Sequence, residues 1–523
     1  MKTYDDAAFE QFCSGLVNDG FSPIHGTGQR RWTGPIRESL KPLTDAARMQ
    51  IVFYDGWPLR YAHVLVSGLK EEHAGNGIVC LWAEDDPAQV AGRKLGVLWR
   101  RLDEWAQAAQ RGFGDDDRAL DAYLLYERRE NLRAELPFSD LIRSGSNGYR
   151  ASMTATMKAG LTLMIEPERE KASDDVAQKP LKGAFYLRGN VAAPPRNFDE
   201  LRALLTKKQK LDLDRGLGAR SSVAIAEPSG GYDFIILAWP RHGREHDAVV
   251  IAFAGNEESL QHFAIAATPN DMAARKKRAG PDVAALEDKK VLIAGAGSVG
   301  GHVAVNLACS GTGTIRLQDS DTLSTANLVR HVSDKYGVGY KKVIAVSLMA
   351  QEHAPWVRIE PIADDLPHDP DALAASILGF DLVVDCTGVF SVSAALGEVC
   401  RRNNVPLIVG ALFHQGALAR VQRQAEGDTV IASRAANADY LTLPPEEPSD
   451  SSPGFLELGC TALVNNAPPV AVFSTAADIA HAAIDFLTGR MERPDERITV
   501  FRQMKAPFDR IGTFEPAISK EAQ

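Results

Sequence analysis

The sequence lacks paired cysteines. No two of its six cysteines form a Cys-x-x-Cys pair; they are Cys13, Cys80, Cys309, Cys386, Cys400 and Cys460. This spacing excludes a zinc ribbon, and it excludes the disulfide framework of a small secreted domain. We therefore expect a cytoplasmic protein with reduced thiols, in which a functionally important cysteine acts as a nucleophile.

Long apolar runs and a strong charge of one sign are also missing. A membrane-spanning helix requires about 20 apolar residues, and no run in this sequence approaches that length. Residues 1–6 are acidic and lack the apolar segment of a secretion signal. The net charge of −10 is spread over 523 residues, which provides no overall attraction for nucleic acid. We expect binding to neither a membrane nor a nucleic acid.

The length suggests about three domains, and the sequence changes in character twice. Residues 1–140 are typical of an α+β domain, with a helical pattern at 5–18, strand-like runs and an amphipathic helix at 87–110. Residues 141–275 carry no chemical motif, and we interpret them as a small connecting domain of unknown role. Residues 276–523 alternate expected strands with expected helices, which predicts an α/β domain with a parallel sheet.

A glycine-rich turn follows the first expected strand of the third domain. Gly295, Gly297 and Gly300 form a G-x-G-x-x-G pattern between this strand and a helix, where a backbone can approach a phosphate or a ribose closely. The next expected strand ends at Asp319, the place where an acidic residue binds ribose hydroxyls. These residues predict a nucleotide site that suits NAD and ATP equally.

The residues that follow indicate adenylyl transfer rather than hydride transfer. Arg330 and Lys342 could neutralise the charge of a triphosphate. Asp385 ends a later strand and could hold Mg²⁺ on the phosphates. Taken singly, Arg330 could instead be a surface charge, Asp385 could cap a helix, and Lys341 could replace Lys342 by a shift of one residue.

The order of these motifs resembles the ThiF/MoeB/ubiquitin-activating superfamily over residues 286–421. That family shows G-x-G-x-x-G, then D-x-D, N-L-x-R, a lysine and a D-C-T strand end, as this sequence does. The resemblance implies a Rossmann-like adenylation domain that uses ATP and Mg²⁺, and it implies a homodimer. It assigns the nucleotide to Gly295, Gly297, Gly300 and Asp319, the phosphates to Asn327, Arg330 and Lys342, and the metal to Asp385. The zinc-binding Cys-x-x-Cys pairs of many members are absent, so we expect no zinc.

Cys80 lies in a second recognisable context. It follows strand-like runs, the Trp57-Pro58 turn and Asn76-Gly77, and it precedes the long helix. This layout resembles a ubiquitin-conjugating enzyme over residues 20–110, which implies that Cys80 carries an acyl group as a thioester. The family's His-Pro-Asn tripeptide is reduced here to His73, and either Asn76 or His73 could replace the missing asparagine.

Cys460 follows an acidic, proline-rich stretch at 443–453 and precedes an apolar helix. Activating enzymes that form a thioester place a cysteine in such a loop, so the resemblance implies that Cys460 receives the acyl group before Cys80 does. A buried cysteine at a helix start explains the same residue about as well.

Together, the two modules predict ATP-dependent activation of a protein C-terminus, thioester transfer through Cys460 to Cys80 and conjugation to a target amine. This order of modules resembles fused bacterial conjugation enzymes of antiphage (CBASS) and ubiquitin-like operons. The acyl donor would then be a ubiquitin-like protein or the tail of a cyclic-nucleotide synthase. Two alternatives remain: an adenylyltransferase for a sulfur carrier of cofactor biosynthesis, and a non-catalytic NAD-binding scaffold.

Overall fold

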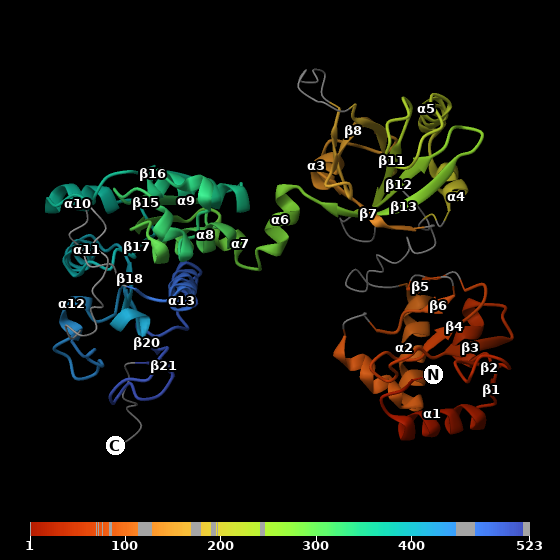
Figure 1. Ribbon diagram of the computed structural model, residues 1–523, viewed down its shortest axis with the longest axis horizontal. Coiled ribbons are helices and arrows are strands. Elements are labelled where there is room, and N and C mark those ends of the chain that lie inside the picture. Colours follow the sequence, from red (N-terminus) through yellow and green to blue (C-terminus); the bar gives the residue numbers. More distant parts are fainter. Residues whose placement is uncertain are drawn as a thin grey trace. The chain divides into compact units, whose positions relative to one another are not determined.

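The computed structural model describes residues 2–69, 71, 73–75, 77–82, 86–112, 128–168, 179–189, 195, 197–240, 246–445 and 466–515. The chain divides into two compact units, Met1–Asp271 and Met272–Gln523 (Figure 1). The first unit contains a six-stranded sheet and a closed barrel, and the second contains an eight-stranded sheet. The predicted division into three domains, with boundaries at 140 and 275, stays a prediction.

The N-terminal sheet is an antiparallel meander in the order β1-β2-β3-β4-β6-β5. A core of buried aromatic and aliphatic residues joins it to two helices, of which the first starts where the Asp5 carboxylate accepts the amide of Ala8. These elements confirm an α+β fold; they are α1 (Asp6–Asn18), β1 (Ser22–Pro23), β2 (Arg31–Pro35), η1 (Glu38–Leu43), β3 (Arg48–Val52), β4 (His63–Leu65), β5 (Ala74–Gly75), β6 (Ile78–Val79), η2 (Pro87–Arg93) and α2 (Leu95–Arg111).

The helix expected at 87–110 differs from the observed elements. A 3-10 segment, η2, covers Pro87–Arg93, and α2 begins only at Leu95, because Lys94 between them has an extended backbone. Gly92 lies within η2 at a close contact, since a Cβ on it would lie 3.0 Å from the Cβ of Tyr61 and 3.2 Å from the Trp82 ring. The single helix that the pattern predicts is therefore observed as two elements, η2 and α2, joined at Lys94.

The segment that carries no chemical motif folds into a seven-stranded closed barrel. Strands β10 to β12 are buried on both faces, because their inner side chains fill the barrel and their outer side chains pack under α4 and α5. The elements are β7 (Arg128–Leu136), α3 (Phe138–Arg143), β8 (Arg150–Lys158), β9 (Thr162–Pro167), β10 (Leu181–Leu187), α4 (Phe198–Leu204), α5 (Lys207–Gly218), β11 (Phe234–Pro240), β12 (His246–Ala254) and β13 (Gln261–Pro269).

The C-terminal sheet has the order β16-β15-β14-β17-β18-β19-β20-β21. Its first five strands are parallel and its last three antiparallel, which confirms the predicted α/β class. The elements are α6 (Met272–Arg278), α7 (Val283–Leu286), β14 (Lys290–Ala294), α8 (Ser298–Cys309), β15 (Thr314–Gln318), η5 (Thr325–Val329), η6 (Lys335–Gly337), α9 (Lys342–His353), β16 (Arg358–Ile362), α10 (Pro370–Ile377), β17 (Leu382–Asp385), α11 (Phe390–Arg402), β18 (Leu407–Phe413), η7 (His414–Gly416), β19 (Leu418–Gln424), α12 (Ile431–Arg434), α13 (Pro469–Leu487), β20 (Glu496–Val500) and β21 (Gly512–Phe514).

The chain order of the parallel strands creates a switch point between β14 and β17. Chain connections leave these neighbouring strands toward opposite sides of the sheet, so a crevice opens at their carboxyl ends. Helices α8, α9 and α13 cover one face and α10 and α11 the other, so β14 is buried on both sides. This burial explains why β14 reads as a continuous apolar run.

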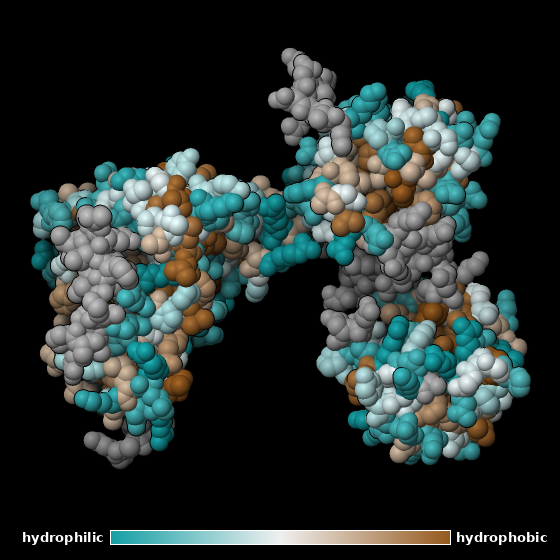
Figure 2. All heavy atoms as spheres, in the orientation of Figure 1, coloured by the Kyte–Doolittle hydropathy of each residue, from teal (hydrophilic) through white to brown (hydrophobic). Residues whose placement is uncertain are grey.

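Helix α13 has the length and apolar composition of a membrane span, with half of that window buried inside the protein. One of its faces packs on α8 and β18 and belongs to the main core, which is the environment of a core helix. Val470 and Phe473 are exposed, and Figure 2 shows hydrophobic residues at the surface where Figure 1 draws α13.

We predict that Ile293→Ala, in the middle of β14, destabilises the C-terminal unit by about 2–5 kcal/mol. Ile293 is fully buried in the main core, so the truncation leaves a cavity that the sheet cannot fill. Native-state hydrogen exchange at the amides of residues 290–294 measures the loss. Leu348→Ala on α9 is the matched control, because Leu348 is 59% exposed and its truncation changes stability by less than about 0.5 kcal/mol. Equal exchange rates in the two variants contradict the prediction.

Candidate functional site

A cavity of about 470 Å³ opens at the carboxyl ends of β14, β15, β16 and β17. Residues in the loops that follow these strands line the cavity, together with Lys342 at the start of α9; the lining includes Gly295, Gly297, Asp319, Asp321, Lys342, Asp365, His368, Cys386 and Thr387. Of the residues predicted for nucleotide binding, the structure brings Gly295, Gly297, Asp319 and Lys342 together around this cavity.

Each of the three glycines in the turn is there for a different physical reason. Gly295 has a φ of +89°, a left-handed conformation that side chains disfavour. A Cβ on Gly300 would lie 1.9 Å from the carbonyl oxygen of Gly295, so only glycine lets α8 approach the turn. A Cβ on Gly297 would meet nothing within 4 Å, and Gly297 lines the cavity. The space in front of Gly297 is therefore open to a ligand at the N-terminus of α8, which carries partial positive charge.

The Asp319 carboxylate fastens the turn to the end of β15. Its Oδ2 accepts the amide of Ala296 at 2.7 Å, and its Oδ1 accepts the amide of Asp321 at 2.8 Å. A carboxylate offers about four acceptor positions. One acceptor position on each oxygen therefore remains, which matches the two hydroxyl groups of a ribose.

His331 holds the same turn from the other side. The amide of Ser333 donates to Nδ1 of His331 at 3.2 Å, so the ring proton lies on Nε2, which donates to the carbonyl oxygen of Ala296 at 3.0 Å. Burial lowers the pKa of His331, and this favours the neutral ring that the two hydrogen bonds require. Only the position of His331 next to Arg330 hinted at this role in the sequence.

Lys342 is the cation at the cavity. Its Nζ lies 2.6 Å from Oδ2 of Asp321, and its side chain is 14% exposed, whereas that of Asp321 is 61% exposed. The neighbouring Lys341 instead donates to the carbonyl oxygen of Ser320 at 2.6 Å. The two lysines therefore have different partners, and of the two Lys342 belongs to the described lining of the cavity; the phosphate contact stays a prediction.

Asp385 ends β17, directly before the lining residue Cys386, and is buried, with an exposed fraction of 1%. Its Oδ1 accepts the amide and the hydroxyl of Thr387 at 2.9 and 2.7 Å, and its Oδ2 accepts the hydroxyl of Ser393 at 2.5 Å. Three of its roughly four acceptor positions are thus used inside the protein. A metal would have one position left on Oδ2, so the predicted Mg²⁺ contact of Asp385 stays a prediction. The described residues contain no cluster of three or more His, Cys, Asp or Glu side chains suited to a metal.

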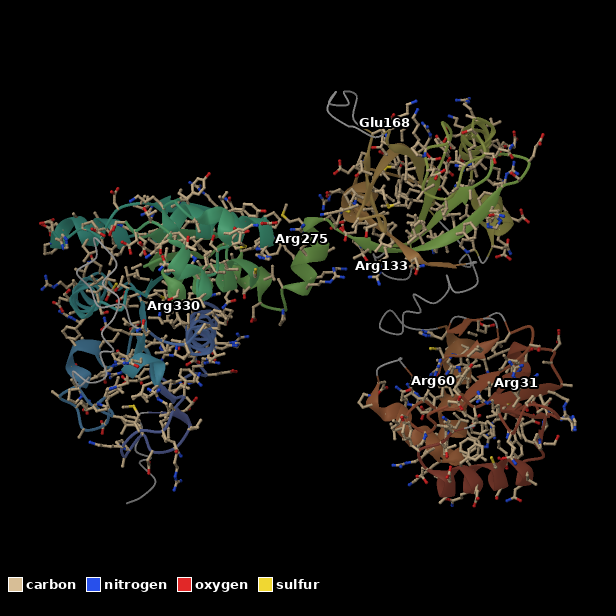
Figure 3. The ribbon with its side chains drawn as sticks, in the orientation of Figure 1. Arg31, Arg60, Arg133, Glu168, Arg275 and Arg330 are labelled. Atoms are coloured by element: carbon tan, nitrogen blue, oxygen red, sulfur yellow. The ribbon has the colours of Figure 1, made fainter. Side chains whose placement is uncertain are left out.

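Asn327 and Arg330 lie at η5 and do not belong to the described lining of the cavity. Asn327 caps η5 by accepting the amide and hydroxyl of Ser324, both at 3.0 Å. Arg330, labelled in Figure 3 beside α13, donates to the carbonyl oxygen of Ala467 at 3.5 Å. Their predicted phosphate contacts stay predictions, and Cys460 falls outside the described residues.

A second candidate site surrounds Cys80, directly after β6. The Cys80 side chain is partly exposed, and its backbone amide donates to the carbonyl oxygen of His73 at 2.8 Å. The other four described cysteines have thiol pKa values raised by burial: Cys13 to about 11, Cys400 to about 12, and Cys309 and Cys386 above their ordinary value. Their burial agrees with a role in packing. Asn76, one candidate for the missing asparagine, lies outside the described residues.

Residues 273–520 match the model of the ThiF family. Molybdopterin-synthase adenylyltransferase of Salmonella typhimurium is 38% identical over 128 residues, which cover 24% of this chain and 51% of that enzyme. The ATP-dependent ubiquitin transferase-like protein Cap2 of Enterobacter hormaechei is 31% identical over 23% of this chain and 20% of its own length. The uncharacterized protein y4qC of Sinorhizobium fredii is 24% identical over 70% of this chain and 69% of its own length. This chain thus spans about half of the adenylyltransferase it matches, and its C-terminal half carries a ThiF/MoeB-like adenylation domain.

We predict that Gly297→Val abolishes nucleotide binding and leaves folding intact. The new side chain would enter the open space of the cavity, and the backbone of Gly297 is extended, which valine tolerates. Calorimetric titration with ATP and thermal unfolding measure the two effects. Gly300→Ala is the contrast, because its Cβ would collide with backbone and lower both binding and stability. Unchanged ATP affinity in Gly297→Val would show that the nucleotide lies elsewhere.

Proposed function

We propose that this chain uses ATP to activate the carboxyl terminus of a protein, a ubiquitin-like protein or the tail of a cyclic-nucleotide synthase, and transfers it through Cys80 to an amine. The observation that carries this proposal is the cavity over the glycine turn, with Asp319 and Lys342 on its wall and Cys80 in a separate α+β fold. Relatives of the C-terminal half include a named adenylyltransferase and a named ubiquitin transferase-like protein.

The first step in this proposal joins a carboxylate to the α-phosphate of ATP. A carboxylate oxygen attacks the α-phosphorus, the bond to pyrophosphate breaks, and an acyl-adenylate results. Asp319 orients the ribose, and the α8 N-terminus and Lys342 balance the phosphate charge, with Lys342 leaving Asp321 as it does so. Arg330 and Asn327 contact the phosphates once the nucleotide is bound. Asp385 would be the residue that holds a Mg²⁺ ion, through the acceptor position left on its Oδ2, and the metal would supply charge neutralisation on the phosphates.

The later steps move the acyl group between sulfur atoms. The Cys460 thiolate attacks the adenylate carbonyl and releases AMP, and the Cys80 thiolate then displaces Cys460. A target amine finally attacks the Cys80 thioester and releases the thiol. Each step replaces one activated acyl bond by another, so the free energy of ATP cleavage reaches the final amide. The chain would act in the cytoplasm as a homodimer, in antiphage defence.

A sulfur-carrier adenylyltransferase is the second candidate function. The 38% identity to molybdopterin-synthase adenylyltransferase over 128 residues favours it. Such an enzyme needs the adenylation cavity and has no use for Cys80. A covalent adduct on Cys80 therefore separates the two functions.

We predict that Lys342→Ala slows ATP–pyrophosphate exchange at least tenfold, while Lys341→Ala stays within twofold of the unchanged protein. Removing Lys342 takes away the cation that lines the cavity, whereas Lys341 bonds a backbone carbonyl. Exchange is measured with radiolabelled pyrophosphate and a set of peptides that end in Gly-Gly. Equal loss in both variants, or loss only in Lys341→Ala, contradicts the assignment of Lys342.

We predict that Cys80→Ser converts a thiol-sensitive adduct on residues 1–112 into a thiol-resistant oxygen ester, because serine forms an ester that thiols do not cleave. Intact-mass spectrometry after reaction with ATP and the same peptides detects the adduct. Cys13→Ser is the matched control, because burial keeps the Cys13 thiol protonated at a pKa of about 11. Adenylate formation without any adduct on Cys80 in the unchanged protein supports the sulfur-carrier alternative instead.

A further inference from the structure

His63 and Cys80 occupy the same face of the N-terminal sheet. Strand β4 pairs with β6 in an antiparallel register that sets Val64 opposite Val79 and Leu65 opposite Ile78. Continued by one residue, this register sets His63 opposite Cys80. Val64 and Val79 are both fully buried in the core, and side chains alternate between faces along a strand. His63 therefore lies on the opposite face of β4, and Cys80, the residue directly after β6, takes the position across from it.

The ladder ends at Val79, directly before Cys80, and two side chains hold the chain just after it. The amide of Leu81 donates to the hydroxyl of Tyr61 at 3.3 Å in place of a backbone carbonyl. The carbonyl oxygen of Leu81 accepts Nε of Arg101 at 2.9 Å. On the other side, Cys80 bonds the backbone of His73. Cys80 is thus fixed at the point where β6 leaves the sheet, with His63 on the neighbouring strand.

The imidazole of His63 has an unusual environment. Its ring contacts those of Tyr54 and Tyr61, with centroid distances of 4.7 and 4.9 Å, and the Arg60 guanidinium stacks on Tyr54. Its Nδ1 is buried and has no hydrogen-bond partner in the part of the chain that the structure describes. A buried polar atom without a partner destabilises a fold by about 1–3 kcal/mol. An unpartnered buried nitrogen requires an explanation, and a hydrogen bond to a bound substrate is one.

His63 is also held uncharged. Burial, assisted by the nearby positive charge of Arg60, lowers the pKa of His63 to about 4. The ring is therefore neutral near pH 7 and carries one proton on one of its two nitrogens. A neutral imidazole of low basicity is a poor proton acceptor and a suitable hydrogen-bond donor to a carbonyl oxygen that becomes negative.

We propose that His63 is a catalytic residue of the Cys80 site, whose Nδ1–H donates a hydrogen bond to the carbonyl oxygen of the acyl group on Cys80. This inference rests on the proposed conjugating function. It gives the oxyanion role of the asparagine that the His73-Ala74-Gly75 sequence lacks to a residue on the adjacent strand.

The donor acts on a balanced reaction. The amine nitrogen attacks the thioester carbon, a C–N bond forms, and the carbonyl electron pair moves onto oxygen, where Nδ1–H of His63 stabilises the charge. The carbonyl then reforms, the C–S bond breaks, and the amine proton passes to the departing Cys80 sulfur. Loss of one such donor slows reactions of this type by about 10²–10³-fold.

The test uses the full chain and needs no ATP. A synthetic peptide thioester that ends in Gly-Gly loads Cys80 by thiol exchange, and free lysine then discharges it; intact-mass spectrometry follows both reactions. We expect His63→Ala to reach the same final loading but to discharge at least tenfold more slowly. His63→Gln should recover part of the rate, because its amide is a donor. His25→Ala, a substitution of an exposed histidine in the same fold, should discharge at the unchanged rate.

The outcomes separate the inference from the function on which it rests. Discharge of His63→Ala within twofold of the unchanged protein overturns the role of His63. Slow discharge that His63→Gln does not relieve also overturns it, because a packing role then explains the loss. A slowed His73→Ala with an unaffected His63→Ala transfers the role to His73. If Cys80 of the unchanged protein does not load or does not discharge to lysine, the conjugating function itself fails.

Discussion

Two hydrogen bonds that the Asp319 carboxylate accepts fix the geometry of the adenylation cavity. They join the amide of Ala296, inside the glycine turn, to the amide of Asp321, after β15. Because His331 binds the carbonyl oxygen of Ala296, one peptide unit of the turn is held on both sides. The open space before Gly297 and the position of Lys342 both depend on this arrangement, since Asp321 carries the ion pair to Lys342. An acidic residue at the end of β15 thus shapes the turn before any ribose reaches it.

The sequence predicts the C-terminal half well because its signals are local. A glycine turn between a strand and a helix, followed by an acid at the next strand end, defines three of the four predicted residues that line the cavity, and Lys342 at the start of α9 is the fourth. The supporting contacts could not be predicted, because they join residues distant in the chain or depend on side-chain orientation. The bonds from Ser393 to Asp385 and from His331 to Ala296 are of this kind, and neither residue type signals its partner.

The barrel shows a second reason why the sequence does not predict the whole fold. Strands β10 to β12 are covered on both faces, so they lack the alternation that marks a half-buried strand. Strand β13 closes the barrel by pairing in parallel with β7, from the opposite end of the segment. Such pairing is a property of the assembled fold, and no periodicity in residues 128–269 encodes it. A connecting domain of unknown role was therefore all that the sequence could indicate.

Activation and conjugation make opposite demands on a site, and this favours separate sites in one chain. An adenylate must be protected from water, as in a cavity formed by four strand ends and the glycine turn. A thioester that serves a protein amine must be reachable, and Cys80 is partly exposed at the end of a short strand. In the proposed relay, linking both sites in one chain would make the transfer between them intramolecular and would raise the effective concentration of one site at the other. In the proposed relay, only the acyl group passes from the adenylation cavity to Cys80. A hydrogen-bond donor for the oxyanion must therefore come from the fold around Cys80. In our proposal His63, one strand away and held neutral, supplies this donor without adding a positive charge beside the attacking amine.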